Sequence, residues 1–527
     1  MINTFKLFAK KTGCALQLIL YSFLFNTATA QHTNILISDT NYPNEPAIVI
    51  NPNNTNQLMA GSNIDNYYYS TDGGSNWTEG ILTSSYGVWG DPVLACDTTG
   101  SFYFFHLSNP PSGNWIDRIV CQKTNAPGAI WSNGSFTGLN GTKAQDKQWV
   151  AIDRSNNTIY MTWTEFDDYG SSDPADSSRI LFSKSADQGQ TWSMPIKINQ
   201  VSGDCIDEDN TTEGAVPAIG PNGEVYVSWA GPAGLVFDKS LDGGATWLAQ
   251  DTPVSSIPGG WDFAIPGIYR ANGLPVTTCD TSGGPNHGTI YINWSDQRNG
   301  PGNTDIWLVK STDGGNTWTL PEKVNDDPSS RQQFFTWMTI DQMTGDLWFV
   351  FYDRRNYADT RTDVYMARST DGGGTFQNFK ISDAPFTPDP GVFFGDYTNV
   401  TAHNNVIRPI WTRLENSQLS VWTALINTTW LGINEEKETD AGLVLEQNFP
   451  NPFAGRTSFS FKLHREEVIS LKIFDFTGRT IVTLIDKESY ALGKHVVSFP
   501  LTLASGTYFY ELTSSNQLLR RKMIIVD

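Results

Sequence analysis

The chain has 527 residues, of which 55 are acidic and 35 basic, so its formal net charge is −20. No Lys or Arg occurs between residues 31 and 117. This surplus of acid excludes nucleic acid and anionic membranes as expected partners. Aromatic residues make up 13% of the chain and no long helical pattern occurs, which favours an all-β fold.

The first 30 residues are expected to be a secretory signal peptide. Lys6, Lys10 and Lys11 precede an apolar run at residues 14–25, and Ala28 and Ala30 follow as a small-x-small cleavage site. The run is too short to cross a bilayer, and no later segment is expected to be transmembrane. We therefore expect an exported protein that is secreted or held at the cell surface.

An eight-residue pattern recurs between residues 70 and 376. It has Ser first, Asp two residues later, Gly four residues later and an aromatic residue seven residues later, which is typical of a tight turn between two strands. Its five intact copies contain Ser70, Asp72 and Trp77; Ser185, Asp187 and Trp192; Ser240, Asp242 and Trp247; Ser311, Asp313 and Trp318; and Ser369, Asp371 and Phe376. A sixth, decayed copy lies at residues 124–131. A repeat of this length, built from strand-like runs, predicts a β-propeller.

The number of blades follows from the strand-like segments between these turns. Paired segments begin near residues 46, 92, 148, 215, 275, 336 and 396, which makes seven units. The last unit supplies three strands, and residues 34–38 resemble a fourth strand that would complete it. We predict a seven-bladed propeller closed by both ends of the domain, with six blades as the alternative.

The recurring turn pattern resembles the Asp-box, or BNR repeat, of sialidases and other secreted propellers. The resemblance implies that each copy lies between the third and fourth strands of a blade, away from the active site. Sialidases grip the substrate carboxylate with three arginines, the first in a Phe/Tyr-Arg-Ile-Pro motif ahead of the first Asp-box. This chain has no Arg in that region. We therefore assign no catalytic residue and do not expect classical exo-sialidase activity.

A second domain is expected at the C-terminal end. Residues 431–442 are polar and acidic, and we interpret them as a linker between a propeller at 31–430 and a domain at 443–527. Motifs at residues 445–453, 471–479 and 505–510 resemble the C-terminal sorting domain of type IX secretion cargo. Short alternating strands predict a small Ig-like β-sandwich there. The resemblance implies the type IX secretion machinery as a partner, and it implies passage across the outer membrane followed by release or by anchoring at the outer-membrane cell surface.

Polar residues gather at the starts of the expected inner strands and after the second strands, and these positions share one face of a propeller. The inner-strand starts carry Glu45, Asp91, Asp146, Glu213, Arg270, Gln333 and Asp396. We predict that a ligand binds on this face through Asp91, Glu213, Arg270, Asp296, Arg298, Asp353, Arg355 and Asp396. The alternative is that Arg298 and Arg355 only clamp neighbouring carboxylates.

One loop has the composition of a calcium site. Asp204, Asp207 and Asp209 are its candidate ligands, although the loop lacks the glycine of an EF-hand, which favours a solvated acidic loop. No other cofactor is expected.

The four cysteines after the signal peptide are expected to be buried apolar residues rather than a disulfide framework. They are Cys96, Cys121, Cys205 and Cys279.

Three classes of function stay open: a glycoside-active enzyme, a non-catalytic glycan- or protein-binding adhesion protein, and a structural surface protein. Fold alone does not choose among them. The converging carboxylates favour the first class, and the missing arginine triad favours the second. We therefore expect a carbohydrate-directed protein that binds or hydrolyses glycans.

Overall fold

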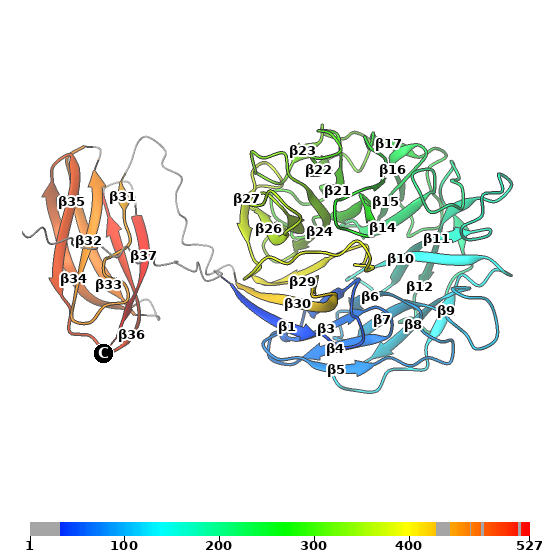
Figure 1. Cartoon of the computed structure of the whole chain (residues 1–527), viewed down its shortest axis with the longest axis horizontal. Helices are drawn as coiled ribbons and strands as arrows, with labels where there is room; N and C mark the ends of the chain where they lie inside the picture. Colours follow the sequence, from blue (N-terminus) through cyan, green and yellow to red (C-terminus); the bar gives the residue numbers. More distant parts are fainter. Residues whose placement is uncertain (1–31, 428–442, 464, 476–478, 515–517, 527) are drawn as a thin grey trace, which may run out of the picture.

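The computed structural model describes residues 32–427, 443–463, 465–475, 479–514 and 518–526. The predicted signal peptide at 1–30 and the predicted linker at 431–442 lie outside these residues. Every regular element of the described chain is a β-strand, and a helix able to span a membrane is absent from it. The strands form a propeller and a second domain of two sheets (Figure 1). The predicted all-β fold class is confirmed.

Seven sheets of four antiparallel strands form the blades. Blade 1 contains β2 (Ala47–Asn51), β3 (Asn54–Ser62), β4 (Asn66–Ser70) and β5 (Thr78–Ile81), and blade 2 contains β6 (Gly90–Cys96), β7 (Phe102–Leu107), β8 (Ile119–Thr124) and β9 (Ser135–Thr137). Blade 3 contains β10 (Ala144–Ile152), β11 (Ile159–Phe166), β12 (Ser178–Ser185) and β13 (Ile196–Lys197), and blade 4 contains β14 (Glu213–Ile219), β15 (Val225–Gly231), β16 (Gly234–Ser240) and β17 (Thr252–Ser255). Blade 5 contains β20 (Val276–Cys279), β21 (Ile290–Asp296), β22 (Asp305–Ser311) and β23 (Glu322–Lys323), and blade 6 contains β24 (Gln333–Asp341), β25 (Asp346–Asp353), β26 (Asp363–Ser369) and β27 (Gln377–Lys380).

Blade 7 is built from both ends of the propeller. It contains β28 (Asn399–His403), β29 (Val406–Glu415) and β30 (Gln418–Asn427), and its outer strand is β1 (Thr33–Ser38). Thr33 pairs with Leu425, and Leu36 with Trp422. The prediction of seven blades with shared closure is confirmed, and the six-bladed alternative is wrong.

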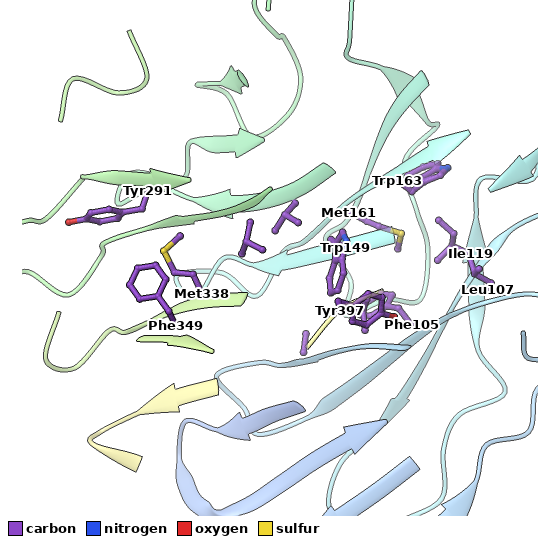
Figure 2. Packing of buried hydrophobic residues seen from close by; sticks show 14 of the residues in the cluster. Phe105, Leu107, Ile119, Trp149, Met161, Trp163, Tyr291, Met338, Phe349 and Tyr397 are labelled. Atoms are coloured by element: carbon purple, nitrogen blue, oxygen red, sulfur yellow. The ribbon is translucent and has the colours of Figure 1, made fainter. Parts of the chain in front are cut away.

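Consecutive inner strands contact each other around the whole ring, from β2 through β6, β10, β14, β20 and β24 to β28 and back to β2. Aromatic side chains fill the space on the axis. The ring of Trp149 lies 4.3 Å from that of Trp337 and 5.2 Å from that of Tyr397. Figure 2 shows Trp149 and Tyr397 side by side among the buried residues. The axis is therefore packed in its middle.

Between blades 4 and 5 the chain forms a small extra hairpin of β18 (Asp262–Phe263) and β19 (Ala271–Asn272). The Trp261 indole donates to the Thr211 carbonyl at 3.1 Å, and the Asp262 amide donates to Asp209 at 2.8 Å. These bonds fix the hairpin to the loop that precedes blade 4.

The repeated turns each join the third and fourth strands of a blade, as the resemblance implied. In the copy at residues 311–318, the Ser311 hydroxyl donates to Asp313 and accepts from the Gly315 amide, both at 2.8 Å. Asp313 also accepts from the Thr317 amide at 3.0 Å and from its hydroxyl at 2.6 Å. Hydrogen bonds from Thr317 are the main reason that the pKa of Asp313 lies below its usual value. The turn thus satisfies its own polar groups.

Each of three turns is also tied to the blade before it. Lys184, Lys239 and Lys310, which stand directly before the Ser of their own turns, donate to the carbonyls of Gly243, Gly314 and Gly372 in the following blades at 2.7, 2.7 and 2.8 Å. The repeat is therefore a contact between blades as well as a turn.

The second domain is a two-sheet sandwich. One sheet contains β31 (Val444–Leu445), β32 (Arg456–Leu463) and β35 (Gly493–Pro500), and the other contains β33 (Glu467–Phe474), β34 (Thr480–Tyr490), β36 (Gly506–Thr513) and β37 (Leu518–Ile525). Phe459 and Phe461 of the first sheet pack with Leu471 and Tyr510 of the second in one buried cluster.

The four cysteines of the described chain are free thiols, and three of them, Cys121, Cys205 and Cys279, are buried. The propeller is thus held together without disulfides among the described residues.

The closure of the ring gives a first prediction. Deleting residues 33–38 should lower the midpoint of thermal unfolding by about 5–10 °C, because it exposes the edge of β30 and removes the buried Ile37. The control is Leu36→Ser, which changes an exposed side chain of the same strand. An unchanged midpoint in the deletion variant would show that the shared blade does not stabilise the ring.

The repeated turn gives a second prediction. Gly314 and Gly315 both have a positive φ, at +71° and +81°, but a Cβ on Gly314 would meet nothing within 4 Å, whereas one on Gly315 would lie 2.3 Å from Phe237 of blade 4. Gly314→Ala should therefore cost only the left-handed backbone strain of about 1 kcal/mol. Gly315→Ala should cost about 3 kcal/mol because the overlap with Phe237 adds to that strain. Chemical denaturation of the two variants measures the difference, and equal losses would contradict the role of this contact between blades.

Candidate functional site

Four inner strands carry the same irregularity where they begin. In each, the register of pairing with the second strand of the blade changes within a few residues. The changes lie between Gly90 and Val93, between Asp146 and Trp149, between Glu213 and Val216, and between Phe334 and Trp337. One residue inside each shift has a left-handed backbone, namely Asp91, Lys147, Gly214 and Phe335, with φ of 51°, 49°, 76° and 50°. A β-bulge of this kind re-aims a side chain. All four residues line cavities at this end of the axis.

Two cationic side chains meet carboxylates at this end of the axis. The Lys147 Nζ lies 2.9 Å from Asp396 and 3.3 Å from Asp91. Arg270 comes from the hairpin between blades 4 and 5, and its Nε donates to Asp396 at 2.8 Å while its Nη2 donates to the second oxygen of the same carboxylate. Its Nη1 donates to Asp207 at 3.2 Å. Blades 2, 3 and 7 and the hairpin are thus joined by one ionic network.

The network gives its carboxyl groups different proton affinities. Burial alone would raise the pKa of Asp396, but Lys147 and Arg270 outweigh burial and hold that pKa below its usual value. Burial raises the pKa of Asp146 to about 7, with Lys147 opposing and Asp91 adding to the rise. Carboxyl groups with such separated pKa values are the usual basis of acid and base roles in one site.

Two further carboxyl groups are buried below the surface. Both oxygens of Glu213 are buried without a hydrogen-bond donor in reach, and burial, followed by the charges of Asp207 and Asp146, raises its pKa well above the usual value. Burial, followed by Asp91 and Asp396, raises the pKa of Glu45 in the same direction. Burial thus favours the protonated form of both carboxyl groups.

A cavity of about 430 Å³ opens above this network. Its polar lining includes Glu45, Asp91, Asp146, Lys147 and Arg270, and its apolar lining includes Tyr42, Trp89, Trp115, Tyr169 and Phe393. Trp89 and Trp115 are 39% and 41% exposed, and their rings meet edge to face at 5.7 Å. The cavity thus has charged groups on one part of its wall and aromatic faces on another.

The structure brings together only some of the predicted ligand-binding residues. Asp91 and Arg270 line the cavity, Asp396 bonds to Arg270 beneath it, and Glu213 lies buried beside Asp146 and Asp207. Asp296, Arg298, Asp353 and Arg355 do not line this cavity.

The last four residues form two similar clamps in blades 5 and 6. Arg298 donates to Asp296 at 2.9 Å and its guanidinium lies 4.4 Å from the ring of Trp307. Arg355 donates to Asp353 at 2.8 Å and lies 4.3 Å from the ring of Tyr365. This geometry favours the structural alternative, and their part in ligand binding stays a prediction.

The three carboxylates of the predicted calcium loop have separate partners. Asp204 accepts from Thr211 at 2.9 Å, Asp207 accepts from Tyr169 at 2.6 Å and Asp209 accepts from the Asp262 amide at 2.8 Å. Within the described ranges, three or more His, Cys, Asp or Glu side chains are nowhere grouped to hold a metal ion. Calcium binding stays a prediction.

Lys147 and the aromatic residues that line the cavity were not predicted from the sequence. Lys147 directly follows the candidate Asp146, but only the bulge turns it toward the axis. Trp89, Trp115 and Tyr169 lie in three different loops, whose convergence no local pattern signals.

The fold and the site define a seven-bladed propeller with a charged, aromatic-walled cavity at one end of its axis, followed by a β-sandwich. Residues 447–526 of the sandwich match the family described as the secretion system C-terminal sorting domain. This match supports secretion or cell-surface export through the type IX system.

Solved structures similar to the chain are carbohydrate-active propeller enzymes. The Hadza microbial sialidase Hz136 is 14% identical with a TM-score of 0.40, over 70% of this chain and 73% of its own. A polysaccharide lyase that acts on ulvan is 13% identical with a TM-score of 0.45, over 75% of this chain and 96% of its own. The sialidase of Trypanosoma rangeli is 11% identical with a TM-score of 0.40, over 85% and 86%. None of the curated proteins matches the chain.

Proposed function

We propose that the protein is an exported, carbohydrate-directed propeller that binds a glycan in the cavity above Lys147 and Arg270. The observation that carries the proposal is the pairing of exposed indole faces with carboxyl groups in one cavity. The apolar C–H face of a sugar ring packs on an aromatic ring, while its hydroxyl groups donate to carboxylates. A volume of about 430 Å³ also lies within the roughly 300–1,000 Å³ of small-ligand pockets.

Hydrolysis of the bound glycan is a second candidate function, favoured by the raised pKa of Asp146. A carboxyl group with a pKa of about 7 still carries its proton near neutral pH and can pass it to the glycosidic oxygen as the C–O bond breaks. Asp91, which is ion-paired with Lys147, lines the same cavity and is placed to take a proton from the attacking water, whose oxygen bonds to the anomeric carbon. The residues of the cavity therefore supply both proton transfers.

The aromatic wall gives a test of glycan binding. Trp115→Ala should weaken the affinity for a bound oligosaccharide about tenfold, or about 1.4 kcal/mol, because it removes one exposed stacking face. The control is Phe136→Ala, which removes an exposed aromatic ring that does not line the cavity. Isothermal calorimetry with oligosaccharides selected on a glycan array measures the effect. Equal losses in the two variants would place the binding site elsewhere.

The acid role of Asp146 gives a test of hydrolysis. Asp146→Asn should retain binding but lower the release of reducing ends about 10²- to 10⁴-fold, because an amide cannot donate the proton. In the unchanged protein the rate should fall as pH rises through about 7, since the acid is active only while protonated. If the protein binds a glycan and releases no product at any pH from 5 to 8, it is a binding protein without this activity.

A further inference from the structure

The two cationic side chains of the cavity are already engaged by carboxylates. Lys147 contacts Asp91 and Asp396, and Arg270 contacts Asp396 and Asp207. Among the described residues that line the cavity, these are the cationic ones. A carboxylate or sulfate on a ligand would therefore have to compete with protein carboxylates that are held in place.

The charge balance around the cavity is acidic. Glu45, Asp91 and Asp146 line it, and Asp207 and Asp396 bond to its cations, so five carboxyl groups face two cationic groups. Even with Glu45 and Asp146 protonated, three carboxylates remain against two cations. The cavity thus offers no net positive charge to an anionic ligand.

The part of the chain that supplies most of the cavity lining also lacks basic residues. Eleven of the sixteen lining residues, from Asn41 to Ile116, come from the part of the chain between residues 31 and 117, which contains no Lys or Arg. The clamped Arg298 and Arg355 do not reach the cavity either. The cations that a ligand carboxylate could meet in this cavity are therefore Lys147 and Arg270, which are already paired with protein carboxylates.

We infer that the cavity selects uncharged sugars and rejects glycans built from acidic sugars. This inference rests on the proposed glycan binding. Carboxylates accept hydrogen bonds from sugar hydroxyl groups, and the aromatic faces of Trp89 and Trp115 need no charge on the ligand. A uronate or a sialate would bring its own negative charge toward Asp91, in a site whose cations are already paired with carboxylates.

The test compares matched oligosaccharides that differ in charge alone. Glucan, mannan and galactan oligosaccharides are measured by calorimetry against glucuronan, mannuronan and galacturonan of the same linkage and length, on the purified protein at low salt. The neutral member of the bound pair should bind at least tenfold more tightly. Equal or tighter binding of the uronate would overturn the inference, whereas the absence of binding by all neutral and acidic members would instead reject the proposed glycan site.

A pair of variants tests the cause. Asp207→Asn removes a charge that contacts Arg270, and Asp209→Asn removes a charge from the same loop without that contact. Asp207→Asn should lower the ratio of neutral to acidic affinity about threefold or more, because the Arg270 guanidinium is then freer to contact a ligand carboxylate. Asp209→Asn should leave this ratio nearly unchanged. If both variants prefer the neutral sugar to the same extent, the pairing of Arg270 with Asp207 is not the cause of the preference.

Discussion

The crowding of seven inner strands around one axis is the constraint on which the rest of the molecule depends. The strands approach so closely that their side chains alone fill the axis, and Trp149, Trp337 and Tyr397 meet there as a packed aromatic group. Because this aromatic group fills the middle of the axis, a ligand has room only at the ends of the axis. At the end where the inner strands begin, four bulges interrupt the pairing and aim Asp91 and Lys147 at the space above the aromatic group.

The ionic network stabilises the buried charges at this end of the axis and shifts the pKa values of the carboxyl groups there. A lysine as buried as Lys147 would be costly alone, and its contacts with Asp91 and Asp396 offset that cost. Burial and these same contacts then separate the proton affinities of neighbouring carboxyl groups. Lys147 and Arg270 hold the pKa of Asp396 below its usual value, whereas burial raises the pKa values of Glu45 and Glu213. Structural support and chemical function are therefore carried by the same side chains.

The fold could be predicted from the sequence because its signals are local and repeated. The Ser-x-Asp-x-Gly turns lie between the third and fourth strands in each copy. The likeness of residues 34–38 to a fourth strand predicted the closure of blade 7. For the candidate site, Asp91, Arg270 and Asp396 are the predicted residues that the structure brings together in one ionic network, and their part in ligand binding stays a prediction. A bulge changes which side chain faces the axis, so alternation along a strand did not reveal Lys147. Sequence also could not tell whether Arg298 faces the axis or lies over Trp307, because both orientations satisfy the same Asp-x-Arg spacing.

The pairing of β1 with β30 also determines the order in which the molecule can be completed. β1 is made first among the propeller strands and β30 last, so no part of blade 7 can receive its outer strand until the chain has been synthesised beyond residue 427. Until then β1 has no partner strand, and an unpaired strand edge is the kind of surface through which chains associate. Pairing partners this distant in sequence also form slowly. A propeller that ends before β30 therefore leaves β1 without its partner, so the outer strand of blade 7 depends on the last strand to be synthesised.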